Sequence, residues 1–181
     1  CYEITLAVET GSRKSFDAFV KKPFTFEKVH EVARLAGKYG ITTVGYFIIG
    51  FPGERLTEIK RSMRFALDLK LDYIMPFIFN PLPGSELWER CLDEGYIDGD
   101  YAYHEANNYF QSDLATGDFI TEDLRRIQAV TYFINLCRFP FRNPRGFLDY
   151  YSRQLLRDPK FLRTFFIHAF QALTMAFRKT K

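Results

Sequence analysis

Residues 41–54 read ITTVGYFIIGFPGE, and this stretch decides the fold. Its first nine residues are almost all apolar or β-branched, which is typical of a strand with apolar side chains on both faces. Gly50, Pro52 and Gly53 then end the strand in a tight turn. Apolar residues follow at helical spacing, at Leu56, Ile59, Met63 and Ala66. The stretch therefore predicts a strand, a turn and an amphipathic helix in succession.

The same unit recurs on either side of this stretch. Residues 2–8 have the pattern of a buried strand, and a helix is predicted from a cap at Thr25 to Gly40. Residues 71–79 form the third predicted strand, which leads through a Pro-rich turn to a short helix over residues 86–94. The first 95 residues thus hold three consecutive βα units.

Strands that alternate with amphipathic helices predict an α/β fold with a parallel sheet covered by helices. Three units cannot close an eight-stranded barrel, but they can form half of a six-stranded partial barrel over residues 1–95. Residues 96–120 are polar and predict a long loop or lid. Residues 121–181 predict a helical region, with helices over 121–137, 145–157 and 160–178 and a break at Phe139-Pro140.

The composition is that of an ordinary globular chain of 181 residues. The chain opens inside a predicted strand and carries no signal-peptide pattern, so we expect a piece of a longer, cytoplasmic protein. Its three cysteines, Cys1, Cys91 and Cys137, have the spacing of neither a disulfide framework nor a metal site, and we expect them to be reduced and structural.

Each predicted strand ends in residues that could hold a ligand, because ligands of parallel α/β folds bind at the carboxyl ends of the strands. Glu9 could accept hydrogen bonds from a ribose diol with Ser12 nearby, or it could cap a helix or pair with Lys14. Glu54 is expected to cap the next helix through its dipole.

Glycines mark the second strand end. Gly45 and Gly50 could leave room for a flat ligand beside Ile48, or they could serve only the turn. In the third unit, Asn80 and Pro81 begin a rigid exit whose backbone could face a ligand, or which could be a turn alone.

Taken together, the three strand ends resemble the radical S-adenosylmethionine (SAM) superfamily, and most closely its branch that is often fused to a cobalamin-binding domain. The resemblance rests on ETGS at 9–12, GYFIIGFPGE at 45–54 and PLPGS at 81–85, and it covers residues 2–95. It implies a partial (βα)6 TIM-like barrel in which this chain supplies the last three units.

The resemblance also implies an activity and its cofactors. Members of the superfamily cleave SAM reductively with a 4Fe–4S cluster held by a CxxxCxxC motif, and the resulting radical attacks the substrate. Glu9 and Ser12 would contact the ribose or methionine part of SAM. Ile48, on the Gly45–Gly50 strand, would flank the adenine, and Asn80 with Pro81 would close its pocket. Lys21 or Lys22 could meet a carboxylate, although a solvated lysine is the simpler expectation.

The sequence departs from this superfamily in one decisive respect, because no CxxxCxxC occurs in it. The cluster ligands, and any cobalamin domain, must therefore lie outside this chain, and we expect the chain alone to be inactive. Its partners would be the N-terminal half of the same polypeptide and a small or lipid-like substrate that is methylated, cyclised or rearranged. No residue of the chain is predicted to bind a metal, and the catalytic residues stay unassigned.

An alternative hypothesis is a non-catalytic docking module. Residues 1–137 carry a net charge of −5, whereas residues 138–181 carry +8 and many aromatics, which favours an anionic partner or a peripheral membrane contact. Nucleic acid is not expected, because no nucleic-acid-binding fold is evident. A different βα enzyme such as an aldolase would need a lysine or a metal cluster at the strand ends, and the absence of lysine from the three strands counts against it. Because half a barrel exposes a strand edge, the isolated chain is expected to self-associate.

Overall fold

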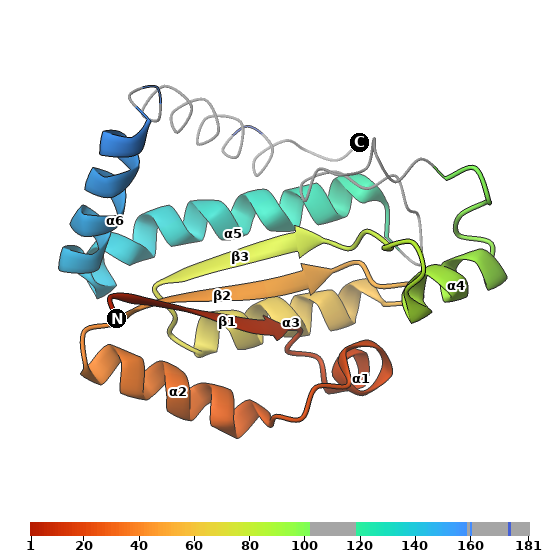
Figure 1. Ribbon diagram of the computed structural model, residues 1–181, viewed down its shortest axis with the longest axis horizontal. Helices are drawn as coiled ribbons and strands as arrows, with labels where there is room; N and C mark the ends of the chain where they lie inside the picture. Colours follow the sequence, from red (N-terminus) through yellow and green to blue (C-terminus); the bar gives the residue numbers. More distant parts are fainter. Residues whose placement is uncertain (102–118, 159, 161–173, 175–181) are drawn as a thin grey trace.

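The computed structural model describes residues 1–101, 119–158, 160 and 174. These residues form an α/β fold around a three-stranded parallel sheet of order β1-β2-β3 (Figure 1). The elements are, in chain order, β1 (Glu3–Glu9), α1 (Arg13–Ser15), the π-helical turn η1 (Phe16–Val20), α2 (Phe26–Lys38), β2 (Thr42–Ile49), α3 (Leu56–Asp68), β3 (Tyr73–Ile78), α4 (Glu86–Asp93), α5 (Thr121–Arg142) and α6 (Pro144–Arg157). The three predicted βα units and the parallel sheet are thereby confirmed.

Local capping explains where the helices of the βα units begin. The Thr25 hydroxyl accepts a hydrogen bond from the Lys28 N–H at 3.3 Å, and Ser85 accepts one from the Trp88 N–H at 3.1 Å. At α3 the carboxylate of Glu58 accepts from the Arg55 N–H at 2.9 Å. The expected capping group Glu54 therefore does not cap this helix.

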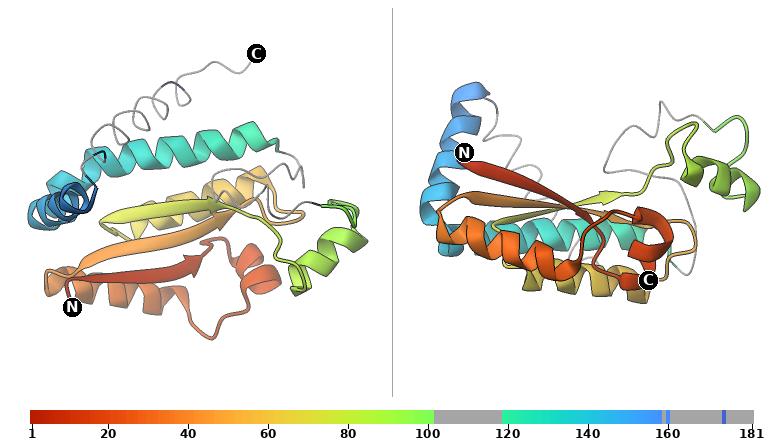
Figure 2. Two further views of the ribbon diagram at one scale, coloured as in Figure 1. Left: turned by 45° about the horizontal axis from the view of Figure 1, so that its top comes forward. Right: turned by 60° about the horizontal axis from the view of Figure 1, so that its bottom comes forward.

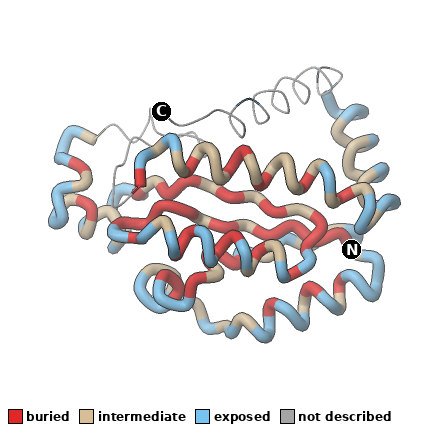
Figure 3. Tube along the Cα trace, turned by 180° about the vertical axis from the view of Figure 1, so that it is seen from behind, coloured by how far each residue is buried: buried red, intermediate tan, exposed pale blue. Residues whose placement is uncertain are grey.

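Among the described residues, helices cover one face of the sheet. Figure 2 shows α2, α3 and α5 along that face, whereas α6 rises past the N-terminal ends of the strands on the other side. The covered face holds the hydrophobic core, and its buried residues lie along the centre of the trace in Figure 3. Its members include Val8, Phe47, Ile49, Ile59, Ile74, Ile78 and Leu124.

The opposite face of the sheet is partly open. Thr5 and Ala7 are exposed there, and Tyr46, Ile48 and Phe77 are partly buried. The strands were predicted to be apolar on both faces. They therefore have one tightly packed face and one partly exposed face of aromatic and aliphatic side chains.

The predicted break at Pro140 is wrong, because α5 continues through it to Arg142. Proline removes one helical hydrogen bond, but Phe139 beside it is 1% exposed, and its ring packs edge-on against Phe147 at 5.5 Å and Tyr73 at 6.3 Å. This packing holds the last turn in place. The helix ends at Asn143, whose side chain accepts from the Gly146 N–H at 2.8 Å and so begins α6.

Two other expectations lie largely outside the described residues. Residues 102–118 hold most of the predicted loop or lid, and residues 161–173 and 175–178 hold most of the predicted last helix. The described helix α6 agrees with the helix predicted over residues 145–157. Within residues 1–101 and 119–158, none of the helices combines the length and apolarity needed to cross a bilayer.

Candidate functional site

A cavity of about 740 Å³ opens at the carboxyl ends of the three strands. We call it the strand-end cavity, and its size lies in the range of small-molecule sites. Of the predicted site residues, Glu9, Ile48 and Asn80 line it, one from each βα unit. Most of the remaining lining is aromatic or aliphatic, with Lys22 as a further charged group. The fold thus brings to one site three residues that are spread over more than 70 positions of the sequence.

Glu9 owes its position to an irregular end of β1. The register between β1 and β2 shifts after Ala7, and Glu9 has a φ of +67°, a left-handed conformation that is uncommon for a residue with a side chain. Its carboxylate accepts a hydrogen bond from the Lys22 ammonium at 2.6 Å, and the Glu9 side chain is 19% exposed. The expected partner Lys14 instead pairs with Glu58 at 2.9 Å. Lys22, which was expected to be solvated, is therefore part of the site.

An aromatic stack forms one wall of the strand-end cavity. The rings of Phe19 and Phe51 lie parallel with centroids 4.9 Å apart, and the Arg90 guanidinium lies 5.2 Å from the Phe19 ring. Phe79 packs on Phe51 at 5.4 Å. No sequence pattern predicted this wall, because Phe19 belongs to a π-helical turn that was not predicted.

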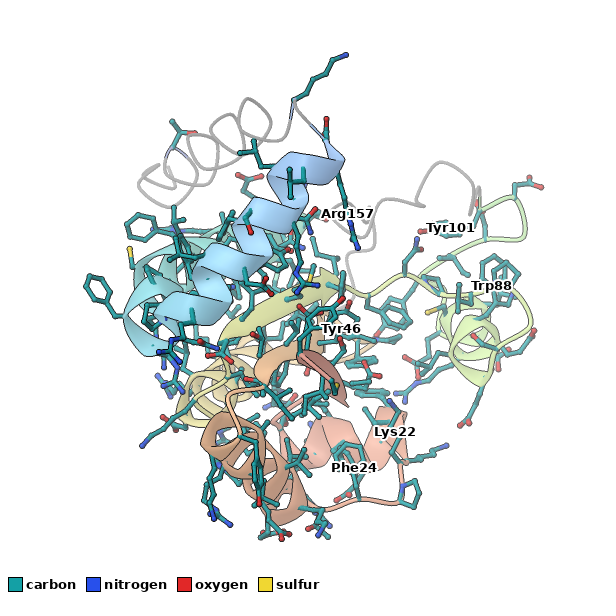
Figure 4. The ribbon with its side chains drawn as sticks, turned by 60° about the vertical axis from the view of Figure 1, so that its left-hand side comes forward. Lys22, Phe24, Tyr46, Trp88, Tyr101 and Arg157 are labelled. Carbon is teal, nitrogen blue, oxygen red and sulfur yellow. The ribbon has the colours of Figure 1, made fainter. Side chains whose placement is uncertain are left out.

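The floor of the cavity is also partly aromatic, and Asn80 on its far side is held by a further aromatic residue. Tyr46 meets Phe77 edge to face at 5.1 Å on the open face of the sheet. The Tyr101 hydroxyl donates to the Asn80 side-chain oxygen at 3.1 Å, and its ring contacts Trp88. Figure 4 shows Lys22 and Tyr101 on different sides of Tyr46. The site therefore has an ion pair on one side, an amide on the other and an apolar surface between them.

The other predicted site residues do not line this cavity. The Ser12 side chain is buried and accepts from the Ser15 N–H at 3.4 Å, so it caps α1. A Cβ at Gly45 would lie 2.3 Å from a Leu71 methyl, and one at Gly50 would lie 2.7 Å from a Leu124 methyl. Core side chains therefore use the space that these glycines leave. Pro81 is buried beside Asn80.

Glu54 has a different position from the one expected. Its side chain is 1% exposed and ties two strand-end loops together. One carboxylate oxygen accepts from the Ser15 hydroxyl at 2.7 Å, and the other accepts from the Gly50 and Phe51 N–H groups at 3.0 and 3.2 Å. Burial raises the pKa of Glu54 above its usual value, against the opposing effect of these three hydrogen bonds.

This raised pKa predicts a pH dependence of stability. Between the unfolded-state pKa near 4.5 and the higher folded-state pKa, the folded chain binds more protons at Glu54 than the unfolded chain does. The contribution of Glu54 to the free energy of unfolding should therefore fall as the pH rises through this window. Urea denaturation of the wild type and of Glu54→Gln, from pH 4 to 8, measures it as their difference. If the stability of the wild type relative to Glu54→Gln increased with rising pH, the raised pKa of Glu54 would be contradicted.

The cysteines of this chain do not fit an iron–sulfur cluster. Cys91 is fully buried in the apolar cluster behind Phe51, and burial raises the pKa of its thiol, which disfavours the thiolate that such clusters need. Cys1 and Cys137 are exposed; Cys1 precedes β1, and Cys137 lies in α5. Among the described residues no group of three or more His, Cys, Asp or Glu side chains could hold a metal ion.

Chemically, the strand-end cavity suits a ligand with a flat apolar part and a hydroxyl-rich part. A ring can lie on Ile48 and the aromatic wall, where it buries apolar area. A carboxylate such as Glu9 can accept hydrogen bonds from a diol, and the Asn80 amide can bond to ring nitrogens or hydroxyls. A nucleoside has both parts.

Comparison with curated proteins shows partial similarity to methyltransferases. The chain is 30% identical over 103 residues to the cytidylyl-2-hydroxyethylphosphonate methyltransferase of Streptomyces wedmorensis, which covers 54% of this chain and 19% of that protein. It is 34% identical over 92 residues to an uncharacterized methyltransferase of Pyrococcus horikoshii, covering 51% and 20%.

The chain is also similar to the tRNA-2-methylthio-N(6)-dimethylallyladenosine synthase of Pseudomonas syringae pv. syringae. The two are 31% identical over 81 residues, which cover 44% of this chain and 18% of that protein. No protein-family model matches the chain. The chain spans about a fifth of the length of the curated relatives it matches. Over about half of its length it is therefore similar to enzymes that are named for the transfer of methyl and methylthio groups.

Proposed function

We propose that this chain is part of a radical SAM enzyme and that the strand-end cavity binds the adenosyl part of SAM. The observation that carries the proposal is the convergence of Glu9, Ile48 and Asn80, from three successive βα units, on one apolar cavity. Glu9 would accept from the ribose hydroxyls, Ile48 would lie against the adenine, and Asn80 would bond to its edge. Ser12, Gly45, Gly50 and Pro81 would act by shaping the loops around it.

The relatives support this proposal. Radical SAM chemistry agrees with their names, because SAM is the usual source of methyl groups and a methylthio group also contains a methyl carbon. The three βα units would be the second half of a partial barrel. The half that precedes them would hold the cluster, and any cobalamin domain would also lie outside these 181 residues. We favour methylation over cyclisation or rearrangement, on an apolar or lipid-like substrate that meets the open face of the sheet.

Because its cysteines do not fit a 4Fe–4S cluster, we assign only the nucleotide site to this chain. Its residues would bind and orient SAM, and the aromatic wall would exclude water. The electron that cleaves SAM would have to come from a cluster held elsewhere. A docking role of residues 138–178 at a membrane or partner stays a prediction, because most of residues 159–178 lie outside the described part of the chain.

Binding tests the proposal directly. Glu9→Ala should weaken SAM or S-adenosylhomocysteine by about tenfold to hundredfold in isothermal titration calorimetry, because a hydrogen bond to a charged group contributes about 1.5–3 kcal/mol. The matched control is Glu31→Ala, which removes an exposed carboxylate of α2 that pairs with Lys28. In the longer polypeptide with its cluster, Glu9→Ala should also reduce 5′-deoxyadenosine formation. Equal affinity of both variants for the nucleotide would refute the assignment.

A further inference from the structure

Helix α5 runs along β3 with its first turns near the carboxyl ends of the strands (Figure 1). Two of its side chains fix this direction, because Asn135 donates to the Ile74 carbonyl at 2.5 Å and Gln128 donates to the Pro76 carbonyl at 2.7 Å. Moving back along α5 therefore means moving forward along β3. Leu124, on the covered side of this row, belongs to the hydrophobic core. The other side of the row is turned toward the open face of the sheet.

Three residues of α5, spaced seven apart, form a row on that open-face side. Arg125, Tyr132 and Phe139 lie nearly above one another, because seven residues make almost two helical turns. The Phe139 ring packs on Tyr73 of β3 at 6.3 Å, and burial, followed by neighbouring phenols that include Tyr132, raises the pKa of Tyr73. Tyr73 is on the open face, since the next residue, Ile74, is in the core. The row therefore places Arg125 on the open-face side as well, toward the strand-end cavity.

Arg125 carries a charge that no described residue neutralises. Its Nε is buried, and no described residue gives its side chain a hydrogen bond or an ion pair. The acidic groups of the open face lie across the sheet on β1, where Glu9 is paired with Lys22. On α5 itself Glu122 is exposed, and the Asp123 carboxylate accepts from the N–H of the residue before the helix at 3.1 Å. A shielded cation without a partner is unfavourable, which favours a bound anion at this place.

We propose that Arg125 binds the anionic group, a carboxylate or a phosphate, of an amphiphilic substrate whose apolar part lies on Tyr46 and Phe77. A guanidinium suits both anions, because its planar fork of N–H donors can bind two oxygens at once. Tyr46 and Phe77 meet edge to face on the open face, and both line the strand-end cavity. An apolar chain on these two rings would reach from Arg125 toward the nucleotide. This inference rests on the proposed function, and it gives the apolar substrate proposed there an acidic end that fixes its orientation.

The Nε–H signal of Arg125 tests the proposal directly in the 181-residue chain. Arginine labelled with 15N at Nε is observed by NMR while octanoate, octyl phosphate or the neutral octan-1-ol is added. We expect the Arg125 signal to shift saturably with octanoate or octyl phosphate, and the anion that moves it identifies the group. The signal of Arg126, which the helix turns away from the sheet, should stay unchanged. An Arg125 signal that neither anion moves, or that octan-1-ol moves as far, would overturn the proposal.

Substitution gives a second, independent measurement. Arg125→Met should weaken the same anion at least tenfold in isothermal titration calorimetry, because it removes a charged hydrogen-bond donor, whereas the matched control Arg126→Met should bind it normally. Both variants should keep their affinity for S-adenosylhomocysteine within twofold, and a tenfold loss in Arg125→Met would assign Arg125 to the nucleotide and refute the proposal.

Thermal unfolding separates a role in binding from a role in folding. Because Arg125 has no partner among the described residues, Arg125→Met should unfold at the same temperature as the wild type or at a higher one. A lower unfolding temperature with unchanged anion affinity would mean that Arg125 pairs within the chain, and the proposal would be wrong. Neither the NMR titration nor the anion affinity needs SAM, so a failure to bind SAM would remove the proposed function without altering these results.

Discussion

Replacing Glu54 by alanine should lower the free energy of unfolding by about 4 kcal/mol, because the change strands three hydrogen-bond donors that share one buried carboxylate. The Gly50 and Phe51 N–H groups and the Ser15 hydroxyl would lose their acceptor in a region that water does not reach. Each such buried group costs about 1–3 kcal/mol. Urea denaturation of wild type and variant gives the difference.

Glu54→Gln provides the control. A glutamine oxygen can still accept from the two backbone N–H groups, and its amide can donate to the Ser15 oxygen, so we expect a loss of less than half that of alanine. Equal losses for the two variants would mean that the carboxylate itself, which glutamine lacks, is what Glu54 contributes, and not the acceptor oxygen and volume that glutamine retains. The alanine variant should also bind nucleotide more weakly, because Phe51 lines the strand-end cavity and its backbone is held by Glu54.

Features of the fold that depend on local patterns were predictable. The strands predicted over residues 2–8, 41–49 and 71–79 agree with β1, β2 and β3 to within about two residues at each end, because apolar runs and turn residues are read over short windows. Thr25 begins α2 for the same reason, since a cap acts within its own turn. Pro140 shows the limit, because packing of Phe139 against distant aromatic rings outweighs the local preference for a break.

The candidate site was predictable only in part. Glu9, Ile48 and Asn80 could be placed at one edge because parallel strands end together. Phe19 stacks on Phe51, 32 residues away, and Ser15 binds Glu54, 39 residues away. No local sequence pattern predicts such contacts. Gly45 illustrates the converse, since the space predicted for a ligand is used by Leu71, a residue of another βα unit.

The loop after β1 owes its place to Gly11, the glycine of the ETGS run. Its N–H donates to the Ser62 hydroxyl of α3 at 2.8 Å, and a Cβ on Gly11 would lie 2.4 Å from the Cβ of Phe65. That atom is fixed to the α3 backbone and cannot rotate away, as the end of a long side chain could. Gly11→Ala must therefore push the loop off α3 or move the helix.

We expect Gly11→Ala to lower the free energy of unfolding by about 3 kcal/mol, which is the upper part of the range for overpacking. Because Glu9 lies two residues away at the bulged end of β1, we also expect nucleotide affinity to fall at least tenfold in calorimetry at a temperature where the variant is folded. Gly37→Ala is the matched control. A Cβ at Gly37 meets nothing within 4 Å, and its place in α2 favours alanine by about 0.5–1 kcal/mol.

The two alanine substitutions should therefore change stability in opposite directions, and only Gly11→Ala should weaken binding. If Gly11→Ala were as stable as Gly37→Ala, the close contact with Phe65 would not exist in solution. If it were unstable but bound the nucleotide normally, the loop would not position Glu9, and the ribose contact would have to come from another residue of the strand-end cavity. Loss of both stability and affinity is the result that a loop clamped on α3 requires.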